Sequence, residues 1–242
     1  MSEAQLAEHN DLWRQKPALR AIYSQYYQEI AANCRSGRTL EIGGGIGNFK
    51  AFMPNVVSSD IQATASLDVV ADAQMLPFET SSFDNIVMFD VLHHLERPLM
   101  FLKEASRLLR PGGRIVVCEP AITPISRFFY KLFHPEPFDL SADLLSEESL
   151  SSPDDPWDSN QAVPTLLFGR QRKGVEGRLP ELAIHQARRF AFIAYPLSGG
   201  FRPWSMISAS LVRPVLALER LLEPFLGPLM AFRLLGVIEK AS

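Results

Sequence analysis

Residues 39–49 read TLEIGGGIGNF, and this stretch decides the fold. An apolar run that contains Glu41 is followed by four glycines within five positions, 43 to 47. The apolar run predicts a buried strand, and the glycines predict a tight turn, because glycine adopts backbone conformations that other residues avoid. In an open α/β sheet, ligands settle at the carboxyl ends of the strands, so the stretch predicts a binding floor.

Strands and helices alternate on both sides of this stretch. Ahead of it, Pro17 suits a helix start, and apolar residues recur at helical spacing from Leu19 to Ile30. Further helices are predicted at residues 48–52 and 98–109. Strands are predicted at residues 38–42, 56–60, 67–71, 83–89 and 114–118. The alternation is typical of a parallel sheet in an α/β protein.

The second half of the chain has a less regular pattern. Residues 121–180, rich in proline, serine and acidic residues, predict a cap with a short helix at 125–133. Two final strands are predicted at residues 188–194 and 231–238, with a helical insertion at 205–229 between them. We expect a single domain over 1–242, composed of a helical cap (1–37), a ligand-binding core (38–120), the cap insertion (121–180) and the last two strands with their insertion (181–242).

Composition excludes several classes of protein. The formal net charge of -3 and the near-neutral balance of charges do not fit a nucleic-acid binder, which carries a basic excess. Only Cys34 and Cys118 are present, so a disulfide framework or a zinc site is not expected. The N-terminal residues do not resemble a signal peptide, and charge or proline interrupts every apolar stretch before it could span a bilayer. We therefore expect a cytoplasmic protein.

The spacing of the glycines discriminates between nucleotide-like ligands. The pattern is E-x-G-x-G-x-G, formed by Glu41, Gly43, Gly45 and Gly47, whereas a dinucleotide site of the G-x-G-x-x-G kind would need glycine at Asn48. An NAD-dependent oxidoreductase is therefore disfavoured. A carboxylate at the turn repels a pyrophosphate but attracts a ligand with an ammonium and a sulfonium group. S-adenosylmethionine is such a ligand, and it carries no phosphate.

Two further acidic residues follow the next two strands. Asp60 ends the second strand, where a carboxylate can accept hydrogen bonds from both ribose hydroxyls. Asp72 ends the third strand and could accept the amino hydrogens of adenine, while the N–H of Ala73 meets a ring nitrogen. Each aspartate alone is more often a helix cap or turn former. Together with the glycine turn and the strand order, they predict a site for an adenosyl ligand.

These residues resemble the class I S-adenosylmethionine-dependent methyltransferases, in particular the broad group that includes enzymes of ubiquinone and menaquinone biosynthesis. The resemblance covers residues 38–120 in the pieces TLEIGGGIGNF, VVSSDI, VVADAQMLPFETSSFDNIVMFDVLHHLERP and FLKEASRLLRPGGRIVVCEP. It implies an α/β fold, a Rossmann-like doubly wound sheet of about seven strands whose last strand is antiparallel, with a helical cap. The short link after Asp60 and the long tract between the last two strands depart from the family pattern.

The resemblance also implies roles for individual residues. Glu41 and the glycines would hold the methionine end of S-adenosylmethionine, Asp60 the ribose, and Asp72 with Ala73 the adenine. Phe89 and Asp90 would contact the methionine portion mainly through their backbone. No metal is implied.

The methyl acceptor is less well defined by the sequence. His93 and His94 follow the fourth strand near the expected methyl group, and either is a candidate base for a hydroxyl acceptor. The alternative is a helix start with one packed and one solvated histidine. Other candidate contacts are Arg14, Lys16 and Arg20 for the methionine carboxylate, and the cluster at residues 157–161 for a ligand.

Residues 201–233 mix aromatic and leucine side chains with Arg202, Arg213, Arg220 and Arg233. This segment could line an apolar acceptor pocket, lie on the inner membrane face as a peripheral contact, or be ordinary core. The sequence thus predicts a methyltransferase that acts on oxygen or carbon of a small or lipid-like acceptor. The alternative is a non-catalytic relative that binds an S-adenosyl ligand as a sensor or scaffold.

Overall fold

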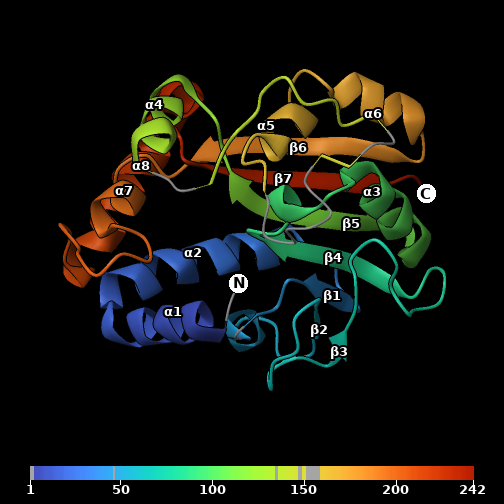
Figure 1. Cartoon of the computed structure of the whole chain (residues 1–242), viewed down its shortest axis with the longest axis horizontal. Helices are drawn as coiled ribbons and strands as arrows, with labels where there is room; N and C mark the ends of the chain where they lie inside the picture. The colour runs from blue at the N-terminus through green and yellow to red at the C-terminus, as the bar shows by residue number, and fades with distance from the viewer. Residues whose placement is uncertain (1–2, 46, 134–135, 147–148, 151–158) are drawn as a thin grey trace.

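A computed structural model describes residues 3–45, 47–133, 136–146, 149–150 and 159–242, without the side chains of residues 3–7. Its centre is a seven-stranded sheet with the order β3-β2-β1-β4-β5-β7-β6 (Figure 1). Neighbouring strands from β3 to β5 run parallel, and β7 is antiparallel to both β5 and β6. The predicted α/β sheet with a last antiparallel strand is confirmed.

The strand order reverses beside β1, which places the carboxyl ends of β1 and β4 next to each other. The strands are β1 (Thr39–Ile42), β2 (Val57–Asp60), β3 (Val69–Val70), β4 (Phe83–Phe89), β5 (Leu109–Pro120), β6 (Leu182–Phe190) and β7 (Arg233–Lys240). The helices are α1 (Glu3–Gln15), α2 (Pro17–Asn33), α3 (Pro98–Leu108), α4 (Pro124–Phe133), α5 (Val163–Leu167), α6 (Arg172–Arg178), α7 (Ala194–Ser198) and α8 (Ala209–Met230), with 3₁₀ turns η1 (Asn48–Ala51) and η2 (Leu92–His94).

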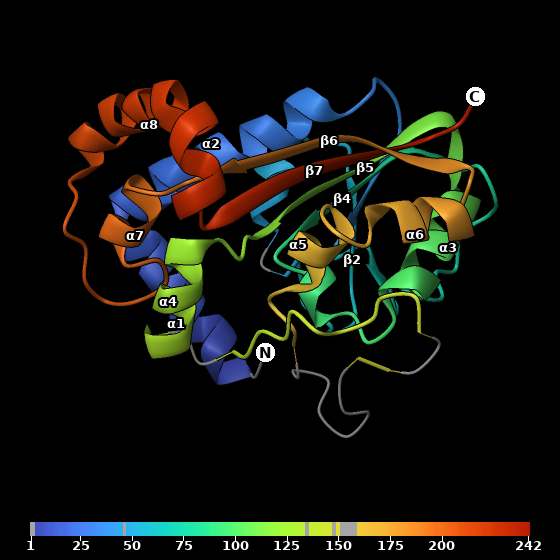
Figure 2. The same ribbon diagram turned by 90° about the horizontal axis from the view of Figure 1, so that it is seen from above.

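Helices cover both faces of the sheet (Figure 2). Successive residues of a strand point to opposite faces, so in β4 Ile86 and Met88 join the core beneath α3, α5 and α6, while Val87 joins the core beneath α2. Helix α2 contributes Leu19, Ile22 and other fully buried side chains to this second core. The apolar run of β4 is thus explained by burial on both sides.

Three strands differ in extent from the prediction. β3 is shortened to Val69–Val70, and no described helix fills the short link that precedes it. β5 begins at Leu109, directly after α3, because Leu109 pairs with Phe83 before the register shifts and Arg114 pairs with Asn85. β6 begins at Leu182 rather than at residue 188. The polar alternation in the first half of β6 hides its signal, because this edge strand buries one face only.

The helix predicted at residues 205–229 is present as α8, whereas α7 begins at Ala194, where the sequence predicts the end of a strand. Helix α8 packs on α2 and β6 and touches α4, and these helices lie together at one end of the sheet (Figures 1 and 2). None of the described helices combines the length and apolar character needed to cross a bilayer.

Candidate functional site

The glycine turn after β1 has close contacts on one side and open space on the other. At Gly43, which has a φ of +75°, an added Cβ would lie 2.1 Å from Cγ2 of Val91. Gly45 has a φ of +47°, and a Cβ there would meet no atom nearer than 3.9 Å. The N–H groups of Gly43 and Gly44 both donate to the Ser59 carbonyl. The turn is therefore fixed to β2 and presents bare main chain at Gly45.

Two carboxylates flank this turn. Glu41 is 7% exposed, and its Oε2 accepts a hydrogen bond of 2.6 Å from the Ser58 hydroxyl. Burial raises the pKa of Glu41, although the Ser58 hydroxyl acts in the opposite direction. Asp60 accepts the N–H of Gly45 at 3.1 Å and that of Gln62 at 3.0 Å, one on each oxygen. Because each carboxylate oxygen has two lone pairs, both side chains keep acceptor capacity for a ligand.

The turn after β3 supplies the third predicted carboxylate. Asp72 accepts the N–H of Gln74 at 2.8 Å and forms an isolated bridge with Met75, which fixes a tight turn. Ala73 is buried within this turn and lines the same cavity as Asp72. The two residues proposed for adenine therefore sit side by side at the carboxyl edge of the sheet.

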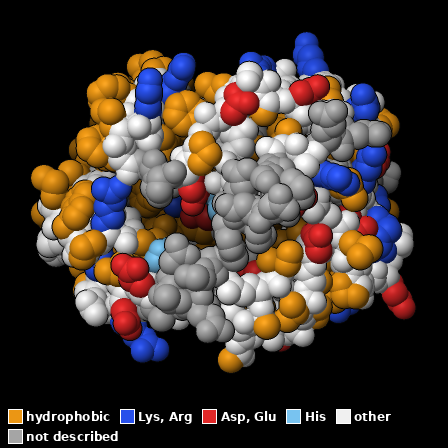
Figure 3. Space-filling view, viewed as in Figure 1, with side chains coloured by type: hydrophobic (Ala, Val, Ile, Leu, Met, Phe, Trp, Pro, Cys, Tyr) orange, Lys and Arg blue, Asp and Glu red, His pale blue; other side chains and the backbone are white. Residues whose placement is uncertain are grey.

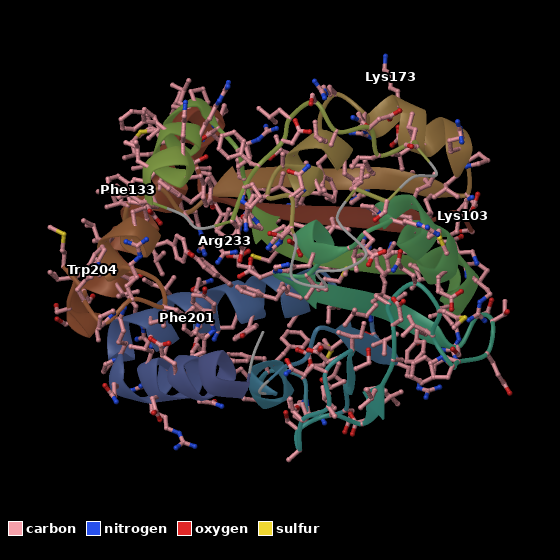
Figure 4. The ribbon with its side chains drawn as sticks, in the orientation of Figure 1. Lys103, Phe133, Lys173, Phe201, Trp204 and Arg233 are labelled. Carbon is pink, nitrogen blue, oxygen red and sulfur yellow. The ribbon has the colours of Figure 1, made fainter. Side chains whose placement is uncertain are left out.

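At the end of β4, Asp90 is tied to a buried arginine. Asp90 has a φ of +56° and hydrogen-bonds Nη1 of Arg233, the first residue of β7. Nη2 of Arg233 donates to the hydroxyls of Tyr23 and Tyr195, both at 3.2 Å, and the guanidinium lies 5.3 Å from the centre of the Phe89 ring. These contacts of Arg233 hold Asp90, whose backbone is strained, at the point where the chain leaves β4. In Figure 4 Arg233 lies in the interior, between α2 and α4.

His93 is buried between two carboxylates. Its Nδ1 lies 2.7 Å from Oε2 of Glu119, and its Nε2 lies 3.6 Å from Oε2 of Glu136. Glu119 is itself fully buried and accepts the N–H groups of Val91 and Leu92. Burial alone would lower the pKa of His93, but the interactions with Glu119 and Glu136 outweigh it and raise the pKa to about 9. His93 is therefore a buried imidazolium at neutral pH.

His94 has the opposite electrostatic character. Burial and the neighbouring charge of His93 lower the pKa of His94 to about 4, so its ring is neutral at neutral pH. Its Nδ1 is buried and makes no hydrogen bond with the part of the chain that the structure describes. The ring lies on the cavity wall, and a neutral imidazole keeps one donor nitrogen and one acceptor nitrogen.

Among the described residues, two groups of side chains have atoms close enough to hold a metal ion. They are His93, His94 and Glu136, and Asp90, His93 and Glu119, each with ligand atoms within 4.8 Å of one another. His93 belongs to both groups and has a carboxylate beside each ring nitrogen, while Asp90 is paired with Arg233. The geometry favours ion pairs at both places.

A cavity of about 910 Å³ connects these residues. Its acidic part, at the ends of β1 to β4, is lined by Glu41, Gly43, Gly44, Gly45, Asp60, Asp72, Ala73 and Phe89. Its aromatic part, beside α2, α4 and α7, is lined by Tyr23, Phe129, Tyr130, Phe133, Tyr195, Phe201, Trp204 and Phe232. The volume is near the upper end of the range of about 300–1,000 Å³ for ligand pockets, so two molecules can share the cavity.

Ten of the eleven predicted site residues line this cavity. They are Glu41, Gly43, Gly45, Asp60, Asp72, Ala73, Phe89, Asp90, His93 and His94. Gly47 lies outside the lining. It has a φ of +77° and donates its N–H to the Gly44 carbonyl, and an added Cβ would lie 2.7 Å from Cβ of Ser66. Gly47 therefore supports the turn from behind.

The basic residues considered for the methionine carboxylate do not line the cavity. Nζ of Lys16 is buried and donates to four backbone carbonyls, those of Ser198, Gly200, Arg202 and Trp204. Arg20 donates to the carbonyls at the end of α1. Arg14 is exposed and lies outside the cavity lining. Lys16 thus holds the chain that carries Phe201 and Trp204 against α2.

Sequence reasoning missed Glu119 and Glu136 and misplaced Arg233. A signal for Glu119 was present, because an acidic residue at the end of the apolar strand IVVCE must find a partner when it is buried. The sequence groups Arg233 with Arg202, Arg213 and Arg220 of residues 201–233, but the structure buries it at 3% exposure as the first residue of β7. Of the cluster at 157–161, Trp157 and Asp158 lie outside the described residues, and Gln161 reaches the cavity.

We expect the His93 charge to make stability depend on pH. The folded chain holds this proton up to a pKa of about 9, whereas the unfolded side chain releases it near 6.5. The stabilising contribution is therefore complete below about pH 6.5 and is lost as the pH rises through about 9. Urea unfolding of the full chain across this window should show falling stability, and His93→Gln should flatten the slope. Equal slopes for the two proteins would contradict the charged state of His93.

The chain is similar to known methyltransferases in sequence and in fold. Residues 40–117 match the family described as methyltransferase domain. A demethylmenaquinone methyltransferase of Staphylococcus aureus is 34% identical over 138 residues, which cover 52% of this chain and 57% of that protein. The chain covers at most 57% of the length of each of these first curated relatives.

Two solved structures share the fold over nearly the whole chain. An S-adenosylmethionine-dependent methyltransferase of Archaeoglobus fulgidus has a TM-score of 0.57 at 17% identity and covers 99% of this chain and 100% of that one. The 1,6-didemethyltoxoflavin-N1-methyltransferase of Burkholderia thailandensis, solved with S-adenosylhomocysteine, has a TM-score of 0.52 at 13% identity and covers 99% and 85%. Residues 40–117 are thus similar to a methyltransferase domain, and the chain shares the fold of these two solved methyltransferases.

Proposed function

We propose that this protein transfers a methyl group from S-adenosylmethionine to an oxygen or carbon atom of a small or lipid-like acceptor. The observation that carries the proposal is the two-part cavity, in which a glycine-floored acidic part opens into an aromatic part. The acidic part matches a cationic adenosyl ligand, and the aromatic part offers an apolar chamber beside it. One cavity can therefore hold donor and acceptor together.

Charge supports the choice of donor. Among the described lining residues, Arg202 and Arg233 are the lysines and arginines of the cavity, and both belong to its aromatic part. A pyrophosphate in the acidic part would face Glu41, Asp60 and Asp72 without a compensating cation. An ammonium and a sulfonium group would instead be attracted to these carboxylates. S-adenosylmethionine, once bound, supplies the electrophilic methyl group.

The walls of the aromatic part support an apolar acceptor. Eight aromatic side chains line it, and the Nε–H of Arg233 makes no hydrogen bond with the described residues. Apolar walls with a few fixed polar groups are typical of sites that orient a small molecule. The demethylmenaquinone methyltransferases among the relatives are named for an acceptor of this character, a ring with an apolar tail. We propose an acceptor of the same chemical class, reached through peripheral contact with a membrane.

Methyl transfer is an in-line displacement, so the chain chiefly aligns two ligands and excludes water. The Asp90–Arg233 pair and the Glu119–His93 pair hold the end of β4 and η2 in place between the two parts of the cavity. His93 is charged and occupied on both nitrogens, which does not favour it as a base. We propose that His94, neutral and on the cavity wall, accepts the proton of an acceptor hydroxyl.

His94→Gln should lower kcat by about tenfold to a hundredfold, since positioned proton transfer contributes roughly 10²-fold or more when the base is well matched. Donor affinity should stay unchanged, because the substitution alters none of the carboxylates that line the acidic part. His185→Gln on the exposed face of β6 is the matched control and should leave both quantities unchanged. An unchanged kcat in His94→Gln would show that the acceptor needs no base from this side chain.

A labelling experiment tests the proposal as a whole. The full chain is incubated with S-adenosylmethionine that carries an isotopically labelled methyl group, together with either a lipid extract or an aqueous metabolite extract. We expect label in a lipid-soluble product. Donor binding by calorimetry without label in either extract would instead identify a sensor or scaffold that binds S-adenosyl ligands.

A further inference from the structure

Exposed apolar side chains are concentrated at one end of the molecule. Twelve of the sixteen large hydrophobic side chains that the structure shows exposed belong to α4, residues 204–206 and α8. Figure 3 shows hydrophobic side chains gathered at this end, with lysine and arginine side chains among them. We call these twelve the apolar end: Ile125, Phe128, Phe129, Leu132, Phe133, Trp204, Met206, Leu211, Leu218, Leu221, Phe225 and Leu229.

Helix α8 presents an apolar stripe away from the protein. Leu211, Leu218, Leu221, Phe225 and Leu229 recur at intervals of three, four and seven residues, which places them on one helix face. Each is exposed, from 49% at Leu218 to 76% at Phe225. The opposite face, which holds the buried residues of α8, packs on α2 and β6. An apolar stripe of this length on the outer face is unusual for a helix whose inner face already packs on the protein.

The charges between these side chains have one sign. On α4 and residues 201–230, the exposed charged residues are Arg127, Lys131, Arg202, Arg213 and Arg220, of which Arg220 pairs with Glu29 of α2. The two acidic residues of the same segments point inward. Glu219 is 4% exposed and accepts the N–H groups of residues 192–194, and Glu223 pairs with Arg188. The chain as a whole has a net charge of -3, whereas the exposed charged residues of these segments are all basic.

We propose that the apolar end binds the surface of an anionic lipid bilayer. Apolar side chains interleaved with arginine and lysine suit the boundary between acyl chains and negatively charged headgroups. A second copy of the chain fits less well, because a two-fold contact through this surface would set arginines against arginines. The surface refines the membrane contact predicted for residues 201–233, since it adds α4 and excludes the buried Arg233.

The apolar end is continuous with the cavity. Phe129, Phe133 and Trp204 belong both to the exposed set and to the aromatic lining. Figure 4 places Phe133 and Trp204 at the same end of the molecule, on α4 and ahead of α8. An acceptor dissolved in the bilayer could thus reach the aromatic part without crossing water. This access route rests on the proposed function, whereas the membrane binding does not.

Flotation with vesicles tests the binding. The full chain is mixed with vesicles of phosphatidylcholine alone, or of phosphatidylcholine with phosphatidylglycerol, at low and at high salt. We expect the chain to float with the anionic vesicles, and the bound fraction to fall at high salt because the headgroup attraction is screened. Absence of binding to the anionic vesicles would overturn the proposal.

Variants locate the surface. Phe128→Ser with Phe225→Ser removes two exposed aromatic side chains outside the cavity lining, and Lys131→Glu with Arg213→Glu reverses two charges. Each pair should lower partitioning into anionic vesicles by about tenfold or more. Lys103→Glu with Lys173→Glu is the matched control, because these lysines are exposed on α3 and α6 at the far side of the molecule (Figure 4). If the control pair lowered partitioning into anionic vesicles as much, net charge alone would govern binding, and the assignment of binding to the apolar end would be overturned.

Two further measurements distinguish a loss of membrane binding from misfolding and from dimerisation. Thermal unfolding and donor binding by calorimetry should match the original chain for all three double variants, since none of the altered residues lines the large cavity. Sedimentation of the chain without lipid should show one species in the original and in the Phe128→Ser with Phe225→Ser variant. A dimer that this variant dissociates would assign the apolar end to a second copy and would contradict the bilayer proposal, whatever the enzyme assay gives.

Discussion

Asp60→Ala is expected to weaken binding of S-adenosylmethionine by about 2–4 kcal/mol, roughly 30-fold to 10³-fold. Two losses combine. The ribose loses a charge-assisted acceptor, and the N–H groups of Gly45 and Gln62 lose the carboxylate that positions them. The effect is measured by calorimetric titration of the full chain with donor or with S-adenosylhomocysteine.

Asp68→Ala is the matched control for this measurement. Asp68 lies on the same link between β2 and β3, where it accepts the N–H of Ser58 and pairs with Lys50, and it is absent from the cavity lining. Donor affinity in Asp68→Ala should remain within about twofold, because the ligand does not meet this side chain. Similar losses in both variants would mean that the link folds poorly in each, and unchanged affinity in Asp60→Ala would remove Asp60 from the site.

Glu119→Ala should lower the free energy of unfolding by about 3–5 kcal/mol, the range for breaking a buried ion pair. The substitution leaves the His93 charge without its closest partner and frees the N–H groups of Val91 and Leu92 inside the protein. Urea unfolding near neutral pH measures the change. Glu119→Gln should lower the free energy of unfolding by less, since its amide oxygen can still accept hydrogen bonds from the two backbone N–H groups.

Glu239→Ala provides the comparison at the protein surface. Glu239 pairs with Arg35 and Arg114 at the other end of the sheet, and its side chain is 27% exposed. The Glu239→Ala substitution should lower the free energy of unfolding by less than about 1 kcal/mol, as for other solvent-exposed ion pairs. If Glu119→Ala were no more destabilising than Glu239→Ala, the buried pair beneath η2 would not hold the end of β4 as we describe.

The parallel part of the fold could be predicted because its signals are local. The apolar strand runs and the glycine turn are each recognised from neighbouring residues, and the order of these signals defines the sheet. Glu41, Asp60 and Asp72 could be placed together for the same reason, since strand ends of a parallel sheet share one edge. The extent of β5 was harder to predict, because Leu109 pairs ahead of a register shift.

The acceptor side could not be predicted in the same way, because its contacts join residues far apart in the chain. Arg233 and Asp90 are separated by 143 positions, and Glu119 and His93 by 26, so neither spacing carries a periodic signal. Helix α8 shows the reverse difficulty. Its leucines fit core, pocket or membrane surface, with core the commonest of the three, and the packing on α2 decides which face is turned outward.

The most direct test of the donor site compares two ligands on the full chain by calorimetry. S-adenosylhomocysteine has the ammonium and adenosyl groups that the acidic part can bind, whereas NAD⁺ brings a pyrophosphate that would face the same carboxylates. We expect a dissociation constant for S-adenosylhomocysteine of about 10 μM or lower and no measurable binding of NAD⁺. Tight binding of NAD⁺ with none of S-adenosylhomocysteine would contradict the assignment of this cavity to a cationic adenosyl donor.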